Sequence, residues 1–293
     1  MPDGATSNRS LERNPELAVA SIYEREIAAS LERVWENVYD WEHLPFLHPQ
    51  AFSVIEKLDS GSWGWHARIG IGEKEAGAAL PEIDLELVTD RPNLKYVSRT
   101  LAGPGAPSEI WTHLDPIGAH RTAIRVEFCV APVPEKALRQ IGKGFVSLYT
   151  RLWDQDEEMM QMREAALSRF FARRDPTRPG DDAGSEASVV SLGSLDALRK
   201  KLPFIVEWHG ESFRIVEVEG EWLAYGAVCP HLLGPMDKAK IVDGKLICPW
   251  HGYAFDLRSG RSRDGRNLRL AKAPRVVVDS LTNQVSLYPN DLL

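Results

Sequence analysis

The sequence has few cysteines, no long hydrophobic run and no excess of positive charge. Three cysteines in 293 residues cannot build a disulfide scaffold, which indicates a reducing compartment, so we expect a cytoplasmic protein. No run of about 18 apolar residues occurs and the N-terminus lacks the apolar core of a signal peptide, so we expect no membrane span and no export. The net charge of -7 argues against nucleic-acid binding.

One polar segment interrupts the chain. Residues 173–187 are rich in Arg, Asp, Pro and Gly and are almost free of large apolar side chains, as is typical of a linker. We therefore predict a first domain over residues 17–172 and a second over residues 188–293, each long enough to bury its own core. Residues 1–16 are polar, and we expect them to be disordered.

The first domain is predicted to be of the α+β class. A strand over residues 17–30 precedes a helix that Ser30 can cap, and a long helix follows Pro134. Six β-like segments separated by turn residues lie between them, at 51–58, 62–71, 82–90, 94–101, 108–114 and 121–131. The long helix has apolar residues at 138, 141, 145, 148 and 152, a spacing that predicts one buried stripe.

This order of elements resembles the helix-grip fold of the START-like superfamily. The motifs Ser-Leu-Glu-Arg-Val-Trp, Asp-Trp-Glu-His-Leu-Pro and His-Pro support the resemblance over the first domain. The resemblance implies a curved antiparallel sheet that wraps the last helix and encloses an apolar cavity. Three tryptophans on the strands are candidates to line this cavity, and the sequence leaves open which of them face inward: Trp63, Trp65 and Trp111.

The second domain contains a paired cysteine and histidine motif. It reads Cys229-Pro-His231 and, after 16 residues, Cys248-Pro-Trp-His251-Gly. Thiolates suit iron–sulfur chemistry, and two histidines in place of two thiolates define a Rieske [2Fe–2S] centre. A zinc site is the alternative, but zinc sites usually group cysteines and histidines separately rather than alternating them. The motif resembles the Rieske family over residues 188–293, which implies a small all-β domain whose cluster is held by these four residues.

The motif lacks features that the resemblance associates with high reduction potential. Rieske proteins of respiratory complexes carry an extra disulfide, and a Ser and a Tyr hydroxyl after the last His-Gly; this chain has no cysteine at the matching positions and has Tyr253 and Phe255. Hydrogen bonds to cluster sulfurs raise the potential, so we predict the low end of the Rieske range, about −150 mV. The resemblance implies that such a cluster accepts electrons from a flavin-containing NAD(P)H reductase or a ferredoxin.

A second metal motif lies in the first domain. Residues 36–48 read Glu-Asn-Val-Tyr-Asp-Trp-Glu-His-Leu-Pro-Phe-Leu-His. This segment resembles the mononuclear-iron motif of Rieske non-haem iron oxygenases, although one residue is missing between Asn37 and Asp40. The resemblance implies that His43 and His48 bind Fe(II).

The same resemblance assigns roles to two further residues of this motif. It implies that Asn37 lies near the iron. It also implies that Asp40 relays electrons to His43 from His251 of a neighbouring subunit, because the family forms rings of three. We therefore expect a homo-oligomer such as a trimer.

The iron site needs a third protein ligand, because a 2-His-1-carboxylate face is typical of O2-activating iron. In the family this ligand is an aspartate on the last long helix, which corresponds to Asp156, with Asp154 as the alternative. Asp156 follows Leu152 by four residues and so falls on the buried stripe, where a carboxylate is costly unless it is paired or metal-bound. Two alternative interpretations are left open. Asp156 could belong to a solvated acidic face of the helix, and Asp40 and His48 could have a structural role, since metal-free helix-grip proteins carry a similar segment.

The two motifs together predict an O2-dependent oxygenase with a Rieske cluster and a mononuclear Fe(II). Its substrate would be an apolar small molecule that is hydroxylated or demethylated. The domain order is the reverse of the family's, in which the cluster domain comes first. The alternatives are a helix-grip domain that binds a hydrophobic ligand beside a tethered Rieske ferredoxin, and a redox sensor or assembly partner without turnover.

Overall fold

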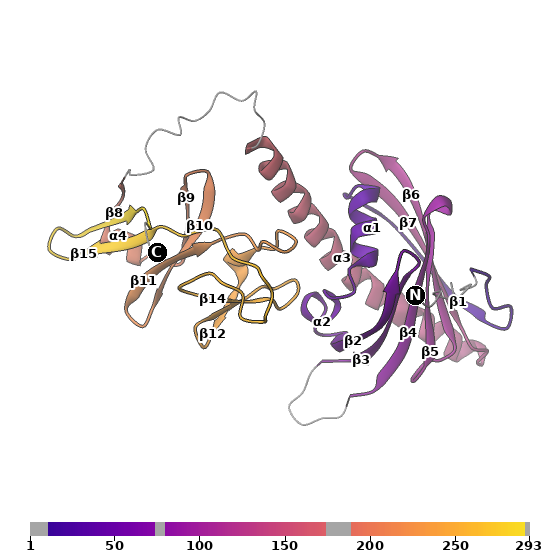
Figure 1. Ribbon diagram of the computed structural model, residues 1–293. Helices are drawn as coiled ribbons and strands as arrows, with labels where there is room; N and C mark the ends of the chain where they lie inside the picture. The colour runs from indigo at the N-terminus through magenta and orange to yellow at the C-terminus, as the bar shows by residue number, and fades with distance from the viewer. Residues whose placement is uncertain (1–10, 74–79, 174–188, 291–293) are drawn as a thin grey trace, which may run out of the picture. The chain divides into compact units, whose positions relative to one another are not determined.

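The computed structural model describes residues 11–73, 80–173 and 189–290 and divides into two compact units, Met1–Gln161 and Met162–Leu293. Figure 1 shows the elements of each unit. The predicted linker at 173–187 lies almost entirely outside the described residues, and the predicted domain boundaries stay predictions. Among the described residues, no helix combines the length and the apolar character needed to cross a membrane.

The first unit is built on a seven-stranded antiparallel sheet in the order β1-β7-β6-β5-β4-β3-β2. Its elements are β1 (Ala18–Ile27), α1 (Leu31–Tyr39), α2 (Leu44–Leu47), β2 (Phe52–Gly61), β3 (Gly64–Ile71), β4 (Glu82–Asp90), η1 (Arg91–Asn93), β5 (Lys95–Ala102), β6 (Ser108–Gly118), β7 (Arg121–Val130) and the greater part of α3 (Glu135–Arg173), whose residues from Met162 onward belong to the second unit. Strands β2 to β7 form a meander, and β1 pairs with β7 to become the edge strand opposite β2 (Figure 1). The predicted α+β helix-grip architecture is confirmed.

Local sequence signals explain the helices of this unit. The side chain of Ser30 accepts a hydrogen bond from the backbone N–H of Arg33 and so caps α1, as predicted. On α3, the ring of Phe145 stacks on Phe128 of β7 at 4.8 Å between centroids. Gly142 brings α3 against β1, because a Cβ at this position would lie 2.4 Å from the carbonyl oxygen of Ala20.

The three tryptophans separate onto the two faces of the sheet. Trp65 belongs to the main core on the α3 side, where its indole N–H donates to the carbonyl of Val38. Trp111 belongs to a smaller cluster with Val88, Val97 and Cys129, and Trp63 packs against it. Trp63 lies in the turn before β3, and Gly64 at φ +130° breaks the alternation that would otherwise place positions 63 and 65 on one face.

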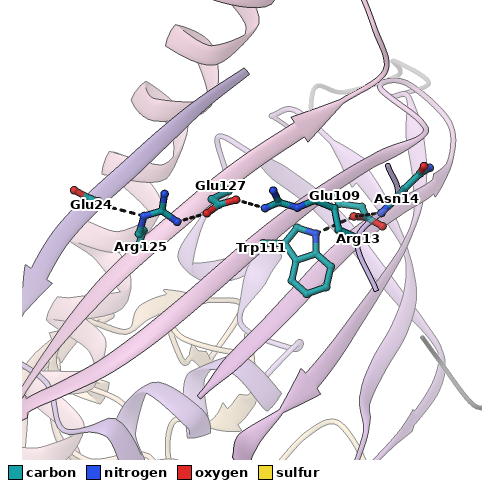
Figure 2. A network of polar contacts seen from close by, with 7 residues as sticks. All are labelled: Arg13, Asn14, Glu24, Glu109, Trp111, Arg125 and Glu127. Carbon is teal, nitrogen blue, oxygen red and sulfur yellow. Dashed lines mark hydrogen bonds and ion pairs between the residues drawn. The ribbon is translucent and has the colours of Figure 1, made fainter. Parts of the chain in front are cut away.

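The N-terminal arm, residues 11–17, packs on this smaller cluster through Leu11 and Leu17. Arg13 forms an ion pair with Glu127, which also pairs with Arg125, as Figure 2 shows. Burial raises the pKa of Glu127, but hydrogen bonds from the two arginines outweigh it, so this pKa lies below its usual value. The expectation of disorder over residues 1–16 is therefore wrong for residues 11–16, because their apolar and charged side chains have partners on the sheet; residues 1–10 lie outside the described residues.

Glu109 is the buried centre of the contacts between the arm and the sheet. Its carboxylate accepts hydrogen bonds from the indole N–H of Trp111 (2.8 Å), from Arg99 (3.0 Å) and from the backbone N–H of Asn14 (3.2 Å) (Figure 2 shows Glu109, Trp111 and Asn14). Its side chain is 8% exposed. Removing a buried carboxylate leaves its cationic and neutral donors without compensation.

We expect Glu109→Ala to lower the free energy of unfolding by about 3 kcal/mol, measured by urea denaturation followed by circular dichroism. The matched control is Glu26→Ala, which removes an ion pair to Arg121 in which both side chains are more than half exposed. An exposed pair contributes at most about 1 kcal/mol. Equal losses in the two variants would contradict the central role of Glu109.

The second unit is a small β domain made of three three-stranded sheets, ordered β11-β10-β9, β12-β13-β14 and β15-β16-β8. Its elements are β8 (Val190–Ser194), α4 (Leu195–Arg199), β9 (Phe204–Trp208), β10 (Glu211–Val218), β11 (Glu221–Gly226), η2 (Met236–Lys238), β12 (Lys240–Val242), β13 (Lys245–Ile247), β14 (Ala254–Asp256), β15 (Arg275–Asp279) and β16 (Gln284–Tyr288). Phe213, Ile215 and Leu287 are among its fully buried core residues. The prediction of a small β domain is confirmed.

Candidate metal centres

The two cluster loops, residues 229–235 and 248–253, carry the four predicted ligands of the second unit. The first loop follows β11 and the second joins β13 to β14. Each loop closes on itself, since the backbone N–H of Cys229 donates to the carbonyl of Gly234 (2.8 Å) and that of Cys248 donates to the carbonyl of Tyr253 (2.9 Å). Both cysteines are 1% exposed.

The two histidines of the loops lie side by side. The rings of His231 and His251 are 4.7 Å apart between centroids and meet edge to face. Nδ1 of His231 is buried, whereas its Nε2 lies 3.4 Å from the hydroxyl of Tyr253. The buried Nδ1 is therefore the nitrogen of His231 that is placed to act as a ligand.

The space between the loops fits a cluster. A Cβ at Gly234 would lie 2.9 Å from Sγ of Cys248 and 3.2 Å from the ring of Trp250, so only glycine leaves room at this wall. The two thiols interact with each other. A hydrogen bond from Cys229 lowers the pKa of Cys248; burial opposes this shift, and a hydrogen bond from His251 adds to it. The same hydrogen bond between the thiols, together with burial, raises the pKa of Cys229. A thiol that deprotonates readily suits iron, because the thiolate is the ligand. Two sulfur and two nitrogen donors match a Rieske [2Fe–2S] cluster.

The first unit brings three predicted metal ligands together. Ligand atoms of His43, His48 and Asp156 lie within 4.8 Å of one another, and all three residues are buried. Nε2 of His43 is 3.4 Å and Nε2 of His48 is 3.1 Å from Oδ1 of Asp156. His43 and His48 lie at the two ends of the single-turn helix α2, which sets the distance between them. Asp156 lies on α3, 108 residues after His48.

Neighbouring polar side chains orient these three residues. Nδ1 of His48 lies 2.7 Å from Oε1 of Gln155, an amide oxygen that can only accept, so Nδ1 donates in this contact while Nε2 faces Asp156. The side-chain amide of Asn37 donates to Oδ1 of Asp156 (3.1 Å). Oδ2 of Asp40 is 3.7 Å from Nδ1 of His43. Asn37 and Asp40, the two residues that the motif predicted near the metal ligands, thus lie beside Asp156 and His43.

Gln155 was not predicted from the sequence. Adjacent residues on a helix point about 100° apart, so the apolar stripe that contains Asp156 gives no reason to expect its neighbour in the same site. Asp154, the alternative third ligand, has a 60% exposed side chain and pairs with Arg25, so the structure does not bring it to the two histidines.

In the metal-free site, the electrostatic environment favours a positive charge on His43 and a negative charge on Asp156. Burial lowers the pKa of His43, but the carboxylates of Asp156 and Asp40 outweigh it and raise this pKa to about 10. Burial raises the pKa of Asp156, but hydrogen bonds from His43 and His48 hold it well below its usual range. The metal-free site therefore holds a buried, ionised carboxylate against a protonated His43. Once a metal displaced that proton, the three residues would offer the donor set of a 2-His-1-carboxylate iron site.

These three residues line a cavity of about 650 Å³ between the sheet and α3. The predicted apolar stripe of α3 forms one wall with Ile141, Phe145, Leu148 and Leu152. The aromatic rings of Phe52, Trp65 and Tyr96 line it as well. Among the described residues, no lysine or arginine lines the cavity, so its surface suits an uncharged apolar ligand.

The second unit matches the Rieske [2Fe-2S] domain family over residues 188–274. This match establishes a Rieske domain, which carries electrons through its cluster. Apoptosis-inducing factor 3 of Homo sapiens is 38% identical over 50 residues, which are 17% of this chain and 8% of that protein. The chain thus spans only a small part of the curated relatives that it matches.

Solved structures resemble each half of the chain. A START superfamily protein from Mycobacterium smegmatis is 18% identical and matches 48% of this chain and 96% of its own, with a TM-score of 0.39. The ferredoxin of carbazole 1,9a-dioxygenase from Nocardioides aromaticivorans IC177 is 23% identical and matches 36% of this chain and all of its own, with a TM-score of 0.30.

Proposed function

We propose that this chain is the oxygenase component of a Rieske-type oxidoreductase that acts on an apolar small molecule. The observation that carries the proposal is the meeting of His43, His48 and Asp156 in the wall of an apolar cavity. When bound, the Rieske cluster would supply single electrons from a reductase or ferredoxin, and a mononuclear Fe(II) would use them with O2 to hydroxylate or demethylate the substrate.

The residues around the ligands have separate roles in this proposal. Gln155 holds the Nδ1 proton of His48 and thereby fixes which nitrogen faces the metal. Asn37 holds one oxygen of Asp156 by its amide. Asp40, next to Nδ1 of His43, is the residue proposed to couple this histidine to the electron donor, with His251 as its partner in a homo-oligomer.

The cavity would bind and orient the substrate. Its aliphatic and aromatic walls exclude water from the side chains that hold the metal, which favours apolar molecules over charged ones. Besides the polar side chains of Gln50, Ser98, Thr100 and Ser108, the wall of the cavity carries the polar group formed by His43, His48 and Asp156. A substrate bound against the stripe of α3 would therefore present one end to the three ligands.

A metal-free ligand-binding domain joined to a Rieske electron carrier is the second candidate. One observation favours it: Asp156 is already paired without a metal, accepting from Asn37 at 3.1 Å and lying 3.1 Å from Nε2 of His48. Such a paired carboxylate would be stable as a structural feature. The two candidates differ in the iron that each requires.

Iron stoichiometry separates the candidates. After anaerobic reconstitution, we expect one iron per chain beyond the two of the cluster, measured by metal analysis together with EPR of the reduced cluster. The reference sample is the same protein loaded with iron and then treated with a chelator that removes mononuclear Fe(II) but leaves the cluster absorbance. A fully loaded chain that holds cluster iron alone would exclude the oxygenase and favour the electron carrier.

A further inference from the structure

An arginine outside the cluster loops stacks on the residue that covers one cluster histidine. The ring of Tyr253 lies parallel to the imidazole of His231, with 4.2 Å between centroids and 18° between planes. The guanidinium of Arg266 lies 3.8 Å from the centroid of Tyr253. Arg266 comes from the segment that follows β14, so the stack joins this segment to both cluster loops.

We propose that Arg266, through this stack, raises the reduction potential of the Rieske cluster. The guanidinium remains charged at any ordinary pH. One-electron reduction adds a negative charge to the cluster, and a nearby cation stabilises that charge. The proposal concerns the Rieske domain alone and does not depend on iron in the first domain.

The stack fixes the position of the charge. Cation–π contact holds the guanidinium against the face of Tyr253, and Tyr253 is held in turn by its ring contact and by its hydroxyl, 3.4 Å from Nε2 of His231. A lysine or a free arginine at this position would spread its charge over many rotamers. The positive charge of Arg266 is therefore separated from the imidazole of His231 by the ring of Tyr253 alone.

Asp264 opposes this charge. Its Oδ2 lies 2.8 Å from Nη1 of Arg266, and its carboxylate is held by Ser262 and by the backbone of the same turn. The side chain of Arg266 is 41% exposed and that of Asp264 is 24% exposed, so water screens both. Removing one charge of the pair leaves the other less compensated, so the two removals change the potential in opposite directions.

The test compares three charge-removing variants of the full chain with a reconstituted cluster, by spectroelectrochemical titration. We expect Arg266→Gln to lower the ratio of reduced to oxidised cluster about threefold at a given potential, which is a shift of about 30 mV for one electron. Asp264→Asn is expected to shift the potential upward by a similar factor. Visible circular dichroism and EPR of each variant establish that the cluster is intact.

Arg275→Gln is the matched control, because Arg275 lies over the ring of Tyr288 at 5.6 Å in the β15–β16 hairpin and touches no cluster-loop ring in this way. Its potential is expected to equal that of the unaltered chain. Opposite shifts of the Arg266 and Asp264 variants support the proposal, since a merely structural disturbance has no reason to change sign. An unchanged potential in Arg266→Gln, or shifts of one sign in both variants, would overturn it.

Discussion

Replacing Asp156 with asparagine is expected to remove the mononuclear iron and leave the Rieske cluster in place. Asparagine keeps the shape of the side chain but lacks the negative charge that Fe(II) requires between His43 and His48. Loss of residues that only orient ligands costs about 10–100-fold in metal affinity, so loss of a ligand is expected to cost at least about 100-fold. Fe(II) titration under anaerobic conditions, followed by metal analysis, measures this loss.

Asp154→Asn is the control for this experiment. Asp154 lies two residues earlier on the same helix and carries the same charge, but it is exposed and pairs with Arg25. We expect this variant to bind iron as the unaltered chain does. If both variants lost the iron equally, the effect would come from the net charge of α3 rather than from ligation.

The second large effect is expected from Cys248→Ser, which should abolish the Rieske cluster. Cys248 is buried, and its pKa is lowered in the pair with Cys229, so it is the thiol best prepared to bind as a thiolate. A serine hydroxyl deprotonates far less readily and is a poor ligand for this iron. Loss of the visible absorbance and of the EPR signal of the reduced cluster measures the effect.

Cys129→Ser is the matched control, because Cys129 is the third cysteine and is also buried, yet it lies on β7 in the first unit. Its variant should keep the cluster. We further expect Cys248→Ser to retain the mononuclear iron that Asp156→Asn loses. Loss of the cluster in the Cys129 variant, or its survival in the Cys248 variant, would refute the assignment of the cluster ligands.

Local patterns determined much of the fold in advance. Alternating strands separated by turn residues predicted the meander, Ser30 predicted the start of α1, and the apolar stripe of α3 predicted the helix wall of the cavity. The cluster motif was equally informative, because its four residues lie in two short loops. In each case the relevant residues are close in sequence, and their spacing reflects the period of the local structure.

Contacts between distant segments were harder to predict. The N-terminal arm looked disordered because its composition is polar, yet Leu11 and Arg13 find partners on the sheet. Gln155 reaches His48 across 107 residues, and composition gave no sign of that contact. Trp63 faces away from the cavity because Gly64 interrupts the strand alternation.

The sequence by itself determined the Rieske domain, the two-layered first domain and the names of the three candidate iron ligands. Only the tertiary structure decided that Asp156, and not Asp154, joins His43 and His48, because a step of two residues, about half a turn of helix, separates a buried carboxylate from an exposed one. It alone revealed the stack of Arg266 on Tyr253 as well. Periodicity specifies which residues share a face, whereas the distance between faces depends on how the whole chain packs.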